Sequence, residues 1–155
     1  MKFEIERKFL IKQLPVDLEK YPVKDIIQGY YLENNQIVRL RQSNNDYFKT
    51  IKGSGIKICS EDEEIISSEV FNKLWSKTIG QRLTKMRHLI PLANNLAIEL
   101  DVFSGVLKGL IMAEVEFTNE EECDAFIPPD WFGQELTADR RYRNYSLATK
   151  GLPQD

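Results

Sequence analysis

Hydrophobic and polar residues alternate along much of this chain, as expected for strands with one apolar and one polar face. The first segment, 2–11, sets three apolar residues against three charged ones: Phe3, Ile5 and Phe9 against Glu4, Glu6 and Lys8. The same pattern, interrupted by turn residues, predicts seven further strands at 25–33, 36–43, 46–52, 56–66, 81–91, 96–103 and 110–117.

Short polar segments separate these strands. Asn34-Asn35 fits a tight hairpin turn, because asparagine tolerates a positive φ. Gly53-Ser54-Gly55 is predicted to form the turn after the fourth strand.

Three segments have helical signals instead. Apolar residues fall on one helical stripe from about 68 to 79, after serines and before Gly80. Thr118 and Glu121 are spaced as a capping box for a short acidic helix. A last helix is expected over 138–150. Few helices among eight strands favour antiparallel pairing, and exposed strand edges favour closure. We therefore predict a mostly β, α+β fold: an eight-stranded antiparallel closed barrel with helices packed outside.

Composition narrows the class of protein. The 155 residues suit one domain, 1–155, and the net charge of −3 argues against a general nucleic-acid partner. We expect no membrane partner, because no apolar run approaches the ~20 residues needed to span a bilayer. Early charges exclude a signal peptide, and two cysteines fit a reducing cytoplasm. With a single histidine, His88, a metal site needs oxygen ligands, which suits Mg²⁺, Mn²⁺ or Ca²⁺.

Paired charges recur at every second residue on several strands. Basic pairs are Arg39/Arg41 and Lys85/Arg87, and acidic pairs are Glu4/Glu6, Glu99/Asp101 and Glu114/Glu116. An antiparallel sheet with one solvated face explains such alternation. Segregated acids and arginines also suit a polyphosphate bound with divalent cations. The pattern alone leaves both interpretations open.

The ordered motifs resemble the CYTH superfamily, also called triphosphate tunnel metalloenzymes. The resemblance spans nearly the whole chain, and most closely concerns the short, single-domain bacterial members. It rests on E-x-E-x-K at 4–8, Gln28-Gly29-Tyr30, R-x-R at 39–41, Thr50-x-Lys52-Gly53, K-x-R at 85–87, D-x-F at 101–103, E-x-E at 114–116 and Glu135-x-Thr137-x-Asp139-x-Arg141-Tyr142-x-Asn144.

That resemblance implies an eight-stranded barrel whose interior is a charged tunnel. It implies that the triphosphate lies against Lys8, Arg39, Arg41, Lys52, Lys85 and Arg87. It also implies that acids bind one or two Mg²⁺ or Mn²⁺ ions: Glu4, Glu6, Glu114 and Glu116, with Asp101 assisting. Tyr30 and Lys85 resemble a tyrosine–lysine pair that assists proton transfer, although Tyr30 can equally be a packing residue.

The fifth strand departs from the family pattern R-x-E-x-E. Alignment without gaps places Ile58, Ser60 and Asp62 at the three positions, with Glu64 next on the same face. Asp62 and Glu64 therefore join the candidate metal ligands. A shift by one residue selects Cys59, Glu61 and Glu63 instead, and the arginine is absent in either register.

We expect a divalent-metal-dependent triphosphatase acting on a small molecule, most simply inorganic tripolyphosphate. The sequence has no G-x-x-x-x-G-K-[ST] loop and no G-x-S-x-G elbow. Hydrolysis of a nucleoside or thiamine triphosphate and cyclisation of ATP remain alternatives. A polyphosphate-binding module without turnover is another, because the fifth strand lacks its arginine.

Overall fold

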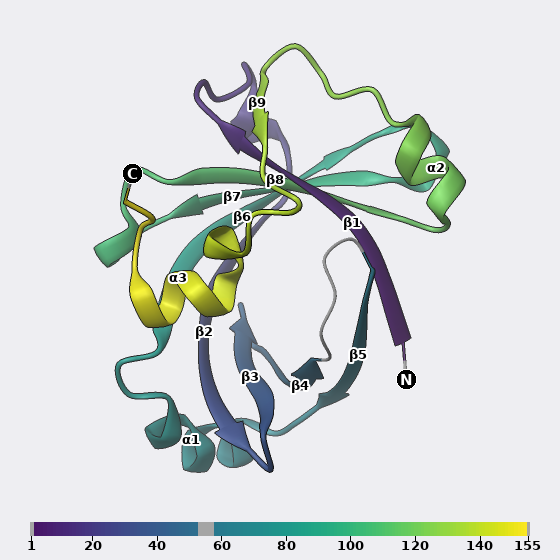
Figure 1. Cartoon of the computed structure of the whole chain (residues 1–155). Helices are drawn as coiled ribbons and strands as arrows, with labels where there is room; N and C mark the ends of the chain where they lie inside the picture. Colours follow the sequence, from purple (N-terminus) through teal and green to yellow (C-terminus); the bar gives the residue numbers. More distant parts are fainter. Residues whose placement is uncertain (1, 53–57, 155) are drawn as a thin grey trace.

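The protein folds as one strongly curved antiparallel sheet with short helices around it (Figure 1). The computed structural model describes residues 2–52 and 58–154, so the predicted turn at 53–55 lies outside the described residues. Within them the strands are β1 (Lys2–Ile11), β2 (Val23–Glu33), β3 (Gln36–Ser43), β4 (Asp46–Lys52), β5 (Ile58–Ile65), β6 (Arg82–Pro91), β7 (Ala97–Phe103), β8 (Ile111–Phe117) and β9 (Phe132–Glu135). Their order is β5-β4-β3-β2-β6-β7-β8-β1-β9.

The two ends of this sheet meet at β1. One edge of β1 pairs with β8, and the other pairs first with β5 over Lys2–Ile5 and then with β9 over Phe9–Ile11. The predicted mostly β, antiparallel class is confirmed, but the count of eight strands is wrong, because the described residues form nine. The predicted closed barrel is also wrong: the sheet is open, and within the described residues β5 meets β1 over only four residue pairs.

Strand β9 was missed because its signal in the sequence is weak. It has only four residues, follows Pro128-Pro129, and its partner β1 lies far away in the chain. Gly133 allows the approach, since a Cβ there would lie 2.6 Å from the Leu10 carbonyl oxygen. Arg7 on β1 also forms a bidentate salt bridge with the Glu135 carboxylate on β9, at 2.8 and 3.0 Å.

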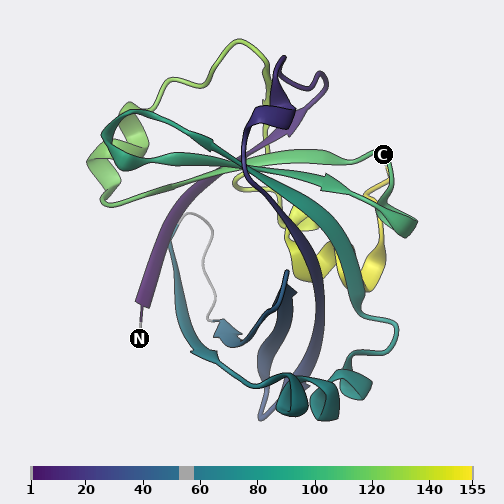
Figure 2. The same cartoon turned by 180° about the vertical axis from the view of Figure 1, so that it is seen from behind.

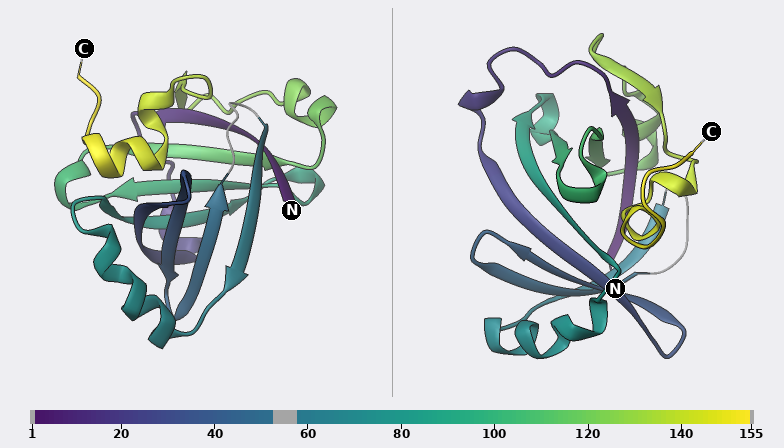
Figure 3. Two further views of the ribbon diagram at one scale, coloured as in Figure 1. Left: turned by 60° about the horizontal axis from the view of Figure 1, so that its bottom comes forward. Right: turned by 90° about the vertical axis from the view of Figure 1, so that its left-hand side faces the viewer.

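Helix α1 (Ser68–Trp75) covers the outer face of β3 and β4 (Figures 2 and 3). Its Phe71 packs into a buried cluster with Tyr31, Val38 and Leu40. The helix ends four residues before the predicted end at 79, because Ser76–Thr78 tighten into a 3₁₀ turn.

Helix α2 (Glu120–Ala125) lies against β1 and β8. Its N-cap is Asn119, one residue later than predicted, and the Asn119 side chain accepts a hydrogen bond from the Glu122 amide. Glu122, not Glu121, returns the contact by accepting one from the Thr118 amide.

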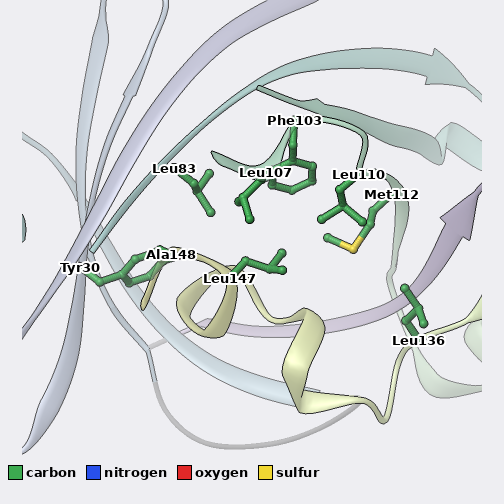
Figure 4. Close-up of a cluster of buried hydrophobic side chains, with 9 residues drawn as sticks. All are labelled: Tyr30, Leu83, Phe103, Leu107, Leu110, Met112, Leu136, Leu147 and Ala148. Carbon is green, nitrogen blue, oxygen red and sulfur yellow. The ribbon is translucent and has the colours of Figure 1, made fainter. Parts of the chain in front are cut away.

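Helix α3 (Asn144–Lys150) lies on the inner side of the curved sheet at one end (Figure 1), so the prediction that the helices pack outside is wrong for this helix. There Leu147 and Ala148 pack against strand residues that include Leu83, Phe103 and Met112 (Figure 4). The helix starts at 144 and not at 138, because Asp139 caps a separate 3₁₀ turn over Arg140–Tyr142. None of the helices in the described residues has the length and apolarity to span a bilayer.

Candidate active site

The concave face of the sheet encloses a pocket of about 540 Å³ with a highly charged lining. Strands contribute most of that lining, and the segment from Arg140 to Lys150 contributes the rest. Seven acidic residues line it: Glu4, Glu6, Glu61, Glu63, Glu99, Glu114 and Glu116. Nine basic residues of the described part of the chain do so: Lys8, Arg39, Arg41, Lys52, Lys85, Arg87, Arg140, Arg143 and Lys150.

The period-two alternation explains why these side chains converge. Residues of one parity on each strand face the pocket, and the other parity packs outward or meets solvent. The structure brings together eleven of the residues singled out in the sequence: Glu4, Glu6, Lys8, Tyr30, Arg39, Arg41, Lys52, Lys85, Arg87, Glu114 and Glu116. The interpretation as a plain solvated sheet face is therefore wrong, since these charges line a shared cavity.

Strand pairing settles the register of β5. Glu61 and Glu63 lie opposite Lys52 and Thr50 and line the pocket. Asp62 lies opposite Ile51 instead, and Glu64 lies opposite Lys49, so both belong to the other face of the strand. This register does not support a place for Asp62 and Glu64 in the site. The backbone of Cys59, opposite Glu4, occupies the place where the family pattern has its arginine.

Asp101 lies behind the pocket lining and is only 2% exposed. Its carboxylate accepts two hydrogen bonds from Arg87, at 2.8 and 2.9 Å, and lies 2.8 Å from the Lys85 ammonium. These neighbouring cations lower its pKa against the opposing effect of burial. Asp101 therefore acts as the counter-ion of two pocket cations, and not as a candidate metal ligand facing the cavity.

We call Glu4, Glu6, Glu61, Glu114 and Glu116 the acidic wall. Two pairs of carboxylates lie within hydrogen-bonding reach there, Glu4 with Glu61 and Glu6 with Glu114. Burial, with the contact to Glu61, raises the pKa of Glu4 to about 8. The negative charge of Glu114, with burial, raises the pKa of Glu6 to about 7. Each pair therefore shares a proton near neutral pH.

Lysines connect this wall to the rest of the pocket. The Lys52 ammonium lies 3.6 Å from Glu4 and 3.4 Å from Glu61, and the Lys8 ammonium lies 3.4 Å from Glu114. These cations help to hold the pKa of Glu61 and of Glu114 below its usual value although burial acts in the other direction.

We call Arg39, Arg41, Lys85, Arg87 and Arg143 the basic wall. Burial lowers the pKa of Lys85 to about 7 and that of Arg41 to about 9. Repulsion from neighbouring cations acts in the same direction. Arg39 Nε and Arg143 Nη2 are buried and, among the described residues, have no hydrogen-bond partner. Buried guanidinium donors without acceptors favour the entry of an anion.

The pocket also contains residues that the sequence did not single out. Arg140, Arg143 and Lys150 add three cations. They lie beside Asn144, the last residue of the family motif, whose side chain accepts a hydrogen bond from the Lys85 ammonium at 2.8 Å. The family motif ending at Asn144 was the available signal. It could not place α3 at the pocket, because that position depends on how Leu147 and Ala148 pack.

The acidic wall offers the oxygen ligands that a hard divalent cation prefers. No group of three acidic, histidine or cysteine side chains in the described residues is already arranged as a metal site. The proton-sharing pairs nevertheless fit such an ion, because Mg²⁺ keeps several waters and uses one or two protein carboxylates. A divalent charge would replace the shared protons.

No family model matches the chain. Individual proteins of similar sequence and structure align with nearly all of it. The inorganic triphosphatase of Nitrosomonas europaea is 43% identical over 148 residues, 94% of this chain and 96% of that protein. The inorganic triphosphatase of Acetivibrio thermocellus is 32% identical over 152 residues, 93% and 92% of the two chains. A crystal structure of an inorganic triphosphatase superimposes with a TM-score of 0.73 at 39% identity, covering 99% of both chains. The chain therefore belongs to the CYTH superfamily, as a relative of the inorganic triphosphatases.

Proposed function

We propose that this protein hydrolyses inorganic tripolyphosphate in the charged pocket, with Mg²⁺ or Mn²⁺ bound at the acidic wall. One observation carries the proposal: a single cavity presents proton-sharing carboxylates on one side and buried arginines with unused donors on the other. A polyphosphate with its cations needs both surfaces. The two relatives named inorganic triphosphatase support the same activity.

The basic wall would hold the phosphate chain. Phosphoryl transfer needs positioning and neutralisation of spread negative charge, and it needs no protein nucleophile. Arg41 suits this task, because among the described residues no carboxylate lies within ion-pair distance of it. Arg39 and Arg143 contribute buried donors, and Arg140 and Lys150 add charge at the end near α3.

The acidic wall would hold the metal, through Glu4, Glu6, Glu61, Glu114 and Glu116. A divalent cation bound there neutralises phosphate charge and lowers the pKa of bound water. The carboxylates must first release their shared protons. Lys52 and Lys8 contact three of them, Glu4, Glu61 and Glu114, and favour the charged forms of Glu61 and Glu114.

Lys85 and Tyr30 would serve the proton transfers. The Lys85 ammonium is fixed by Asp101 and Asn144, each at 2.8 Å, and its pKa near 7 lets it give or hold a proton at neutral pH. The Tyr30 ring is buried, and Tyr30 lines the same pocket. Both groups can therefore donate to a phosphoryl oxygen.

The pocket favours an inorganic chain over a nucleotide or a thiamine ester. Of the lining residues described, Tyr30 and Tyr145 are the aromatic ones, and their rings pack edge to face, 5.5 Å apart. One ring thus presents its edge to the face of the other, and this pair leaves little aromatic surface for stacking an organic base.

The test is a turnover assay with purified protein. Tripolyphosphate, ATP and thiamine triphosphate are each incubated with Mg²⁺, Mn²⁺ or EDTA, and phosphate, pyrophosphate and cyclic AMP are measured. We expect phosphate and pyrophosphate from tripolyphosphate, only with a metal. Tight metal-dependent binding of tripolyphosphate without turnover would instead identify a binding module.

A further inference from the structure

Gln28 on β2 is a fully buried amide directly behind the basic wall, with 0% exposure. Its side chain makes three hydrogen bonds. Its Oε1 accepts from Arg41 Nε at 2.9 Å, and its Nε2 donates to the Tyr30 hydroxyl at 2.9 Å and to Asn144 Oδ1 at 3.0 Å. Both donors and one acceptor site of the amide are therefore in use.

The orientation of this amide is fixed by the groups at its two ends. Arg41 Nε can only donate, so the Gln28 oxygen must face it. The Lys85 ammonium can also only donate, so the Asn144 oxygen must face Lys85. That oxygen therefore accepts again from Gln28, and the Gln28 nitrogen must be the group that faces Asn144 and Tyr30.

This orientation determines what the Tyr30 hydroxyl can do. Its oxygen accepts the second hydrogen of Gln28 Nε2, which cannot accept in return. In the part of the chain that is described, this is the one hydrogen bond made to the Tyr30 hydroxyl. The tyrosine proton is left to point elsewhere, and Tyr30 lines the pocket.

Gln28 has a parallel effect on Arg41. It holds Nε, and none of the described residues hydrogen-bonds the two terminal nitrogens of the guanidinium group, so these nitrogens can bind a ligand. Burial makes each of these hydrogen bonds stronger than in water, and leaving them unmade would be costly.

We infer that Gln28 is a positioning residue that makes Tyr30 a hydrogen-bond donor toward the bound phosphate chain and aims the terminal nitrogens of Arg41 at the same ligand. The inference rests on the proposed triphosphatase function and deepens it. Gln28 touches no substrate itself. It acts through Tyr30 in the chemical step and through Arg41 in binding.

The test uses the near-isosteric Gln28→Met in two backgrounds, the wild type and Tyr30→Phe. In the wild type, we expect kcat for tripolyphosphate to fall about 10- to 100-fold, because the tyrosine proton is no longer directed. KM should rise by a smaller factor, because Arg41 loses its anchor. In the Tyr30→Phe background the loss of kcat should disappear, while the rise in KM remains.

Equal losses of kcat in the two backgrounds would overturn the inference, because a general structural defect does not depend on the tyrosine hydroxyl. The matched control is Gln42→Met on β3, whose amide donates to the Asn44 carbonyl outside the pocket. It should leave kcat and KM unchanged. Failure of the wild type to release phosphate from tripolyphosphate would refute the proposed function itself, which is a different result from unaffected Gln28 variants.

A second variant covers the case in which Gln28→Met does not fold. Gln28→Glu keeps the acceptor for Arg41, but its carboxylate would also accept the Tyr30 proton and turn it away from the pocket. We expect kcat to fall as far as in Tyr30→Phe, with circular dichroism unchanged. A wild-type kcat in folded Gln28→Glu would overturn the inference.

Discussion

The acidic and basic walls of the pocket manage buried charge in opposite ways. In the acidic wall like charges face each other, and Glu4 and Glu6 share protons with Glu61 and Glu114 although Lys52 and Lys8 lie nearby. In the basic wall Asp101 pairs with both Arg87 and Lys85, and the Gln28 amide holds Arg41. The acidic wall is thus incomplete without a cation, whereas the basic wall is already assembled for an anion.

The largest effect should follow from changing the acidic wall. Glu4→Gln removes one carboxylate from the proposed metal site and keeps the side-chain shape. We expect kcat for tripolyphosphate to fall about 10²–10³-fold, the scale on which charge stabilisation in a transition state acts. Phosphate release at saturating Mg²⁺ measures it, and the exposed Glu69→Gln on α1 is the control. Unchanged turnover would remove Glu4 from the metal site.

The basic wall should respond to loss of its counter-ion by losing stability. Asp101→Ala removes the carboxylate that Lys85 and Arg87 share, leaving Arg87 its contact with Glu99, and removing one partner of a buried ion pair costs about 3–5 kcal/mol. Urea denaturation measures the change in the free energy of unfolding. The exposed Asp130→Ala should change it by less than about 0.5 kcal/mol. Similar values for both variants would contradict the assigned role of Asp101.

A smaller effect is expected where the basic wall has an unused donor. Arg143→Met removes a guanidinium whose buried Nη2 has no partner among the described residues. A charge-assisted hydrogen bond of about 1.5 kcal/mol corresponds to a roughly tenfold rise in KM for tripolyphosphate, with kcat little changed. Steady-state kinetics separate the two constants. Lys108→Met, an exposed change away from the pocket, serves as the control.

The smallest effect concerns the shared protons of the acidic wall. The folded protein raises the pKa of Glu4 and Glu6 from 4.5 to about 8 and 7, so it favours their protonated forms. This stabilisation is complete below pH 4.5 and is lost as the pH rises through 7 and 8. In EDTA we expect Tm to fall by about 5 °C between pH 6 and pH 9.

Scanning calorimetry of Glu4→Gln tests whether the acidic wall causes this fall of Tm with pH. The variant lacks one of the two titrating groups, so its Tm should depend less on pH over the same range. Added Mg²⁺ should restore Tm at pH 9 in the wild type and do so less in the variant. Parallel curves for the two proteins would place the pH dependence outside the acidic wall.

The sequence predicted the parts of this arrangement that depend on local pattern. The bounds of β1, β3 and β4 match the predicted ranges, because period-two alternation and asparagine turns specify them locally. Glu4, Arg39 and Lys85 point into one pocket because each occupies an inward-facing position of the same period-two alternation. The resemblance to the family supplied the role of the cavity.

Features that depend on distant packing could not be predicted in this way. Both registers of β5 satisfy the alternation, and only pairing of Thr50 with Glu63 selects the inward one. The contribution of Arg143 depends on where α3 docks. Strand β9 has only four residues, too few for a clear alternation in the sequence. The hydrogen-bonding role of Gln28 needs four side chains from three elements to be placed at once.

The pairing of β1 has a consequence for how the molecule folds. All partners of this strand are remote in sequence: even the nearest, Ile58 opposite Ile5, lies more than fifty residues further on. Long loops must therefore close before β1 gains any contact, which makes such pairings late and slow. Glu6 and Lys8 meet Glu116 and Glu114 only in that step. The pocket is therefore complete only after these long-range pairings have formed.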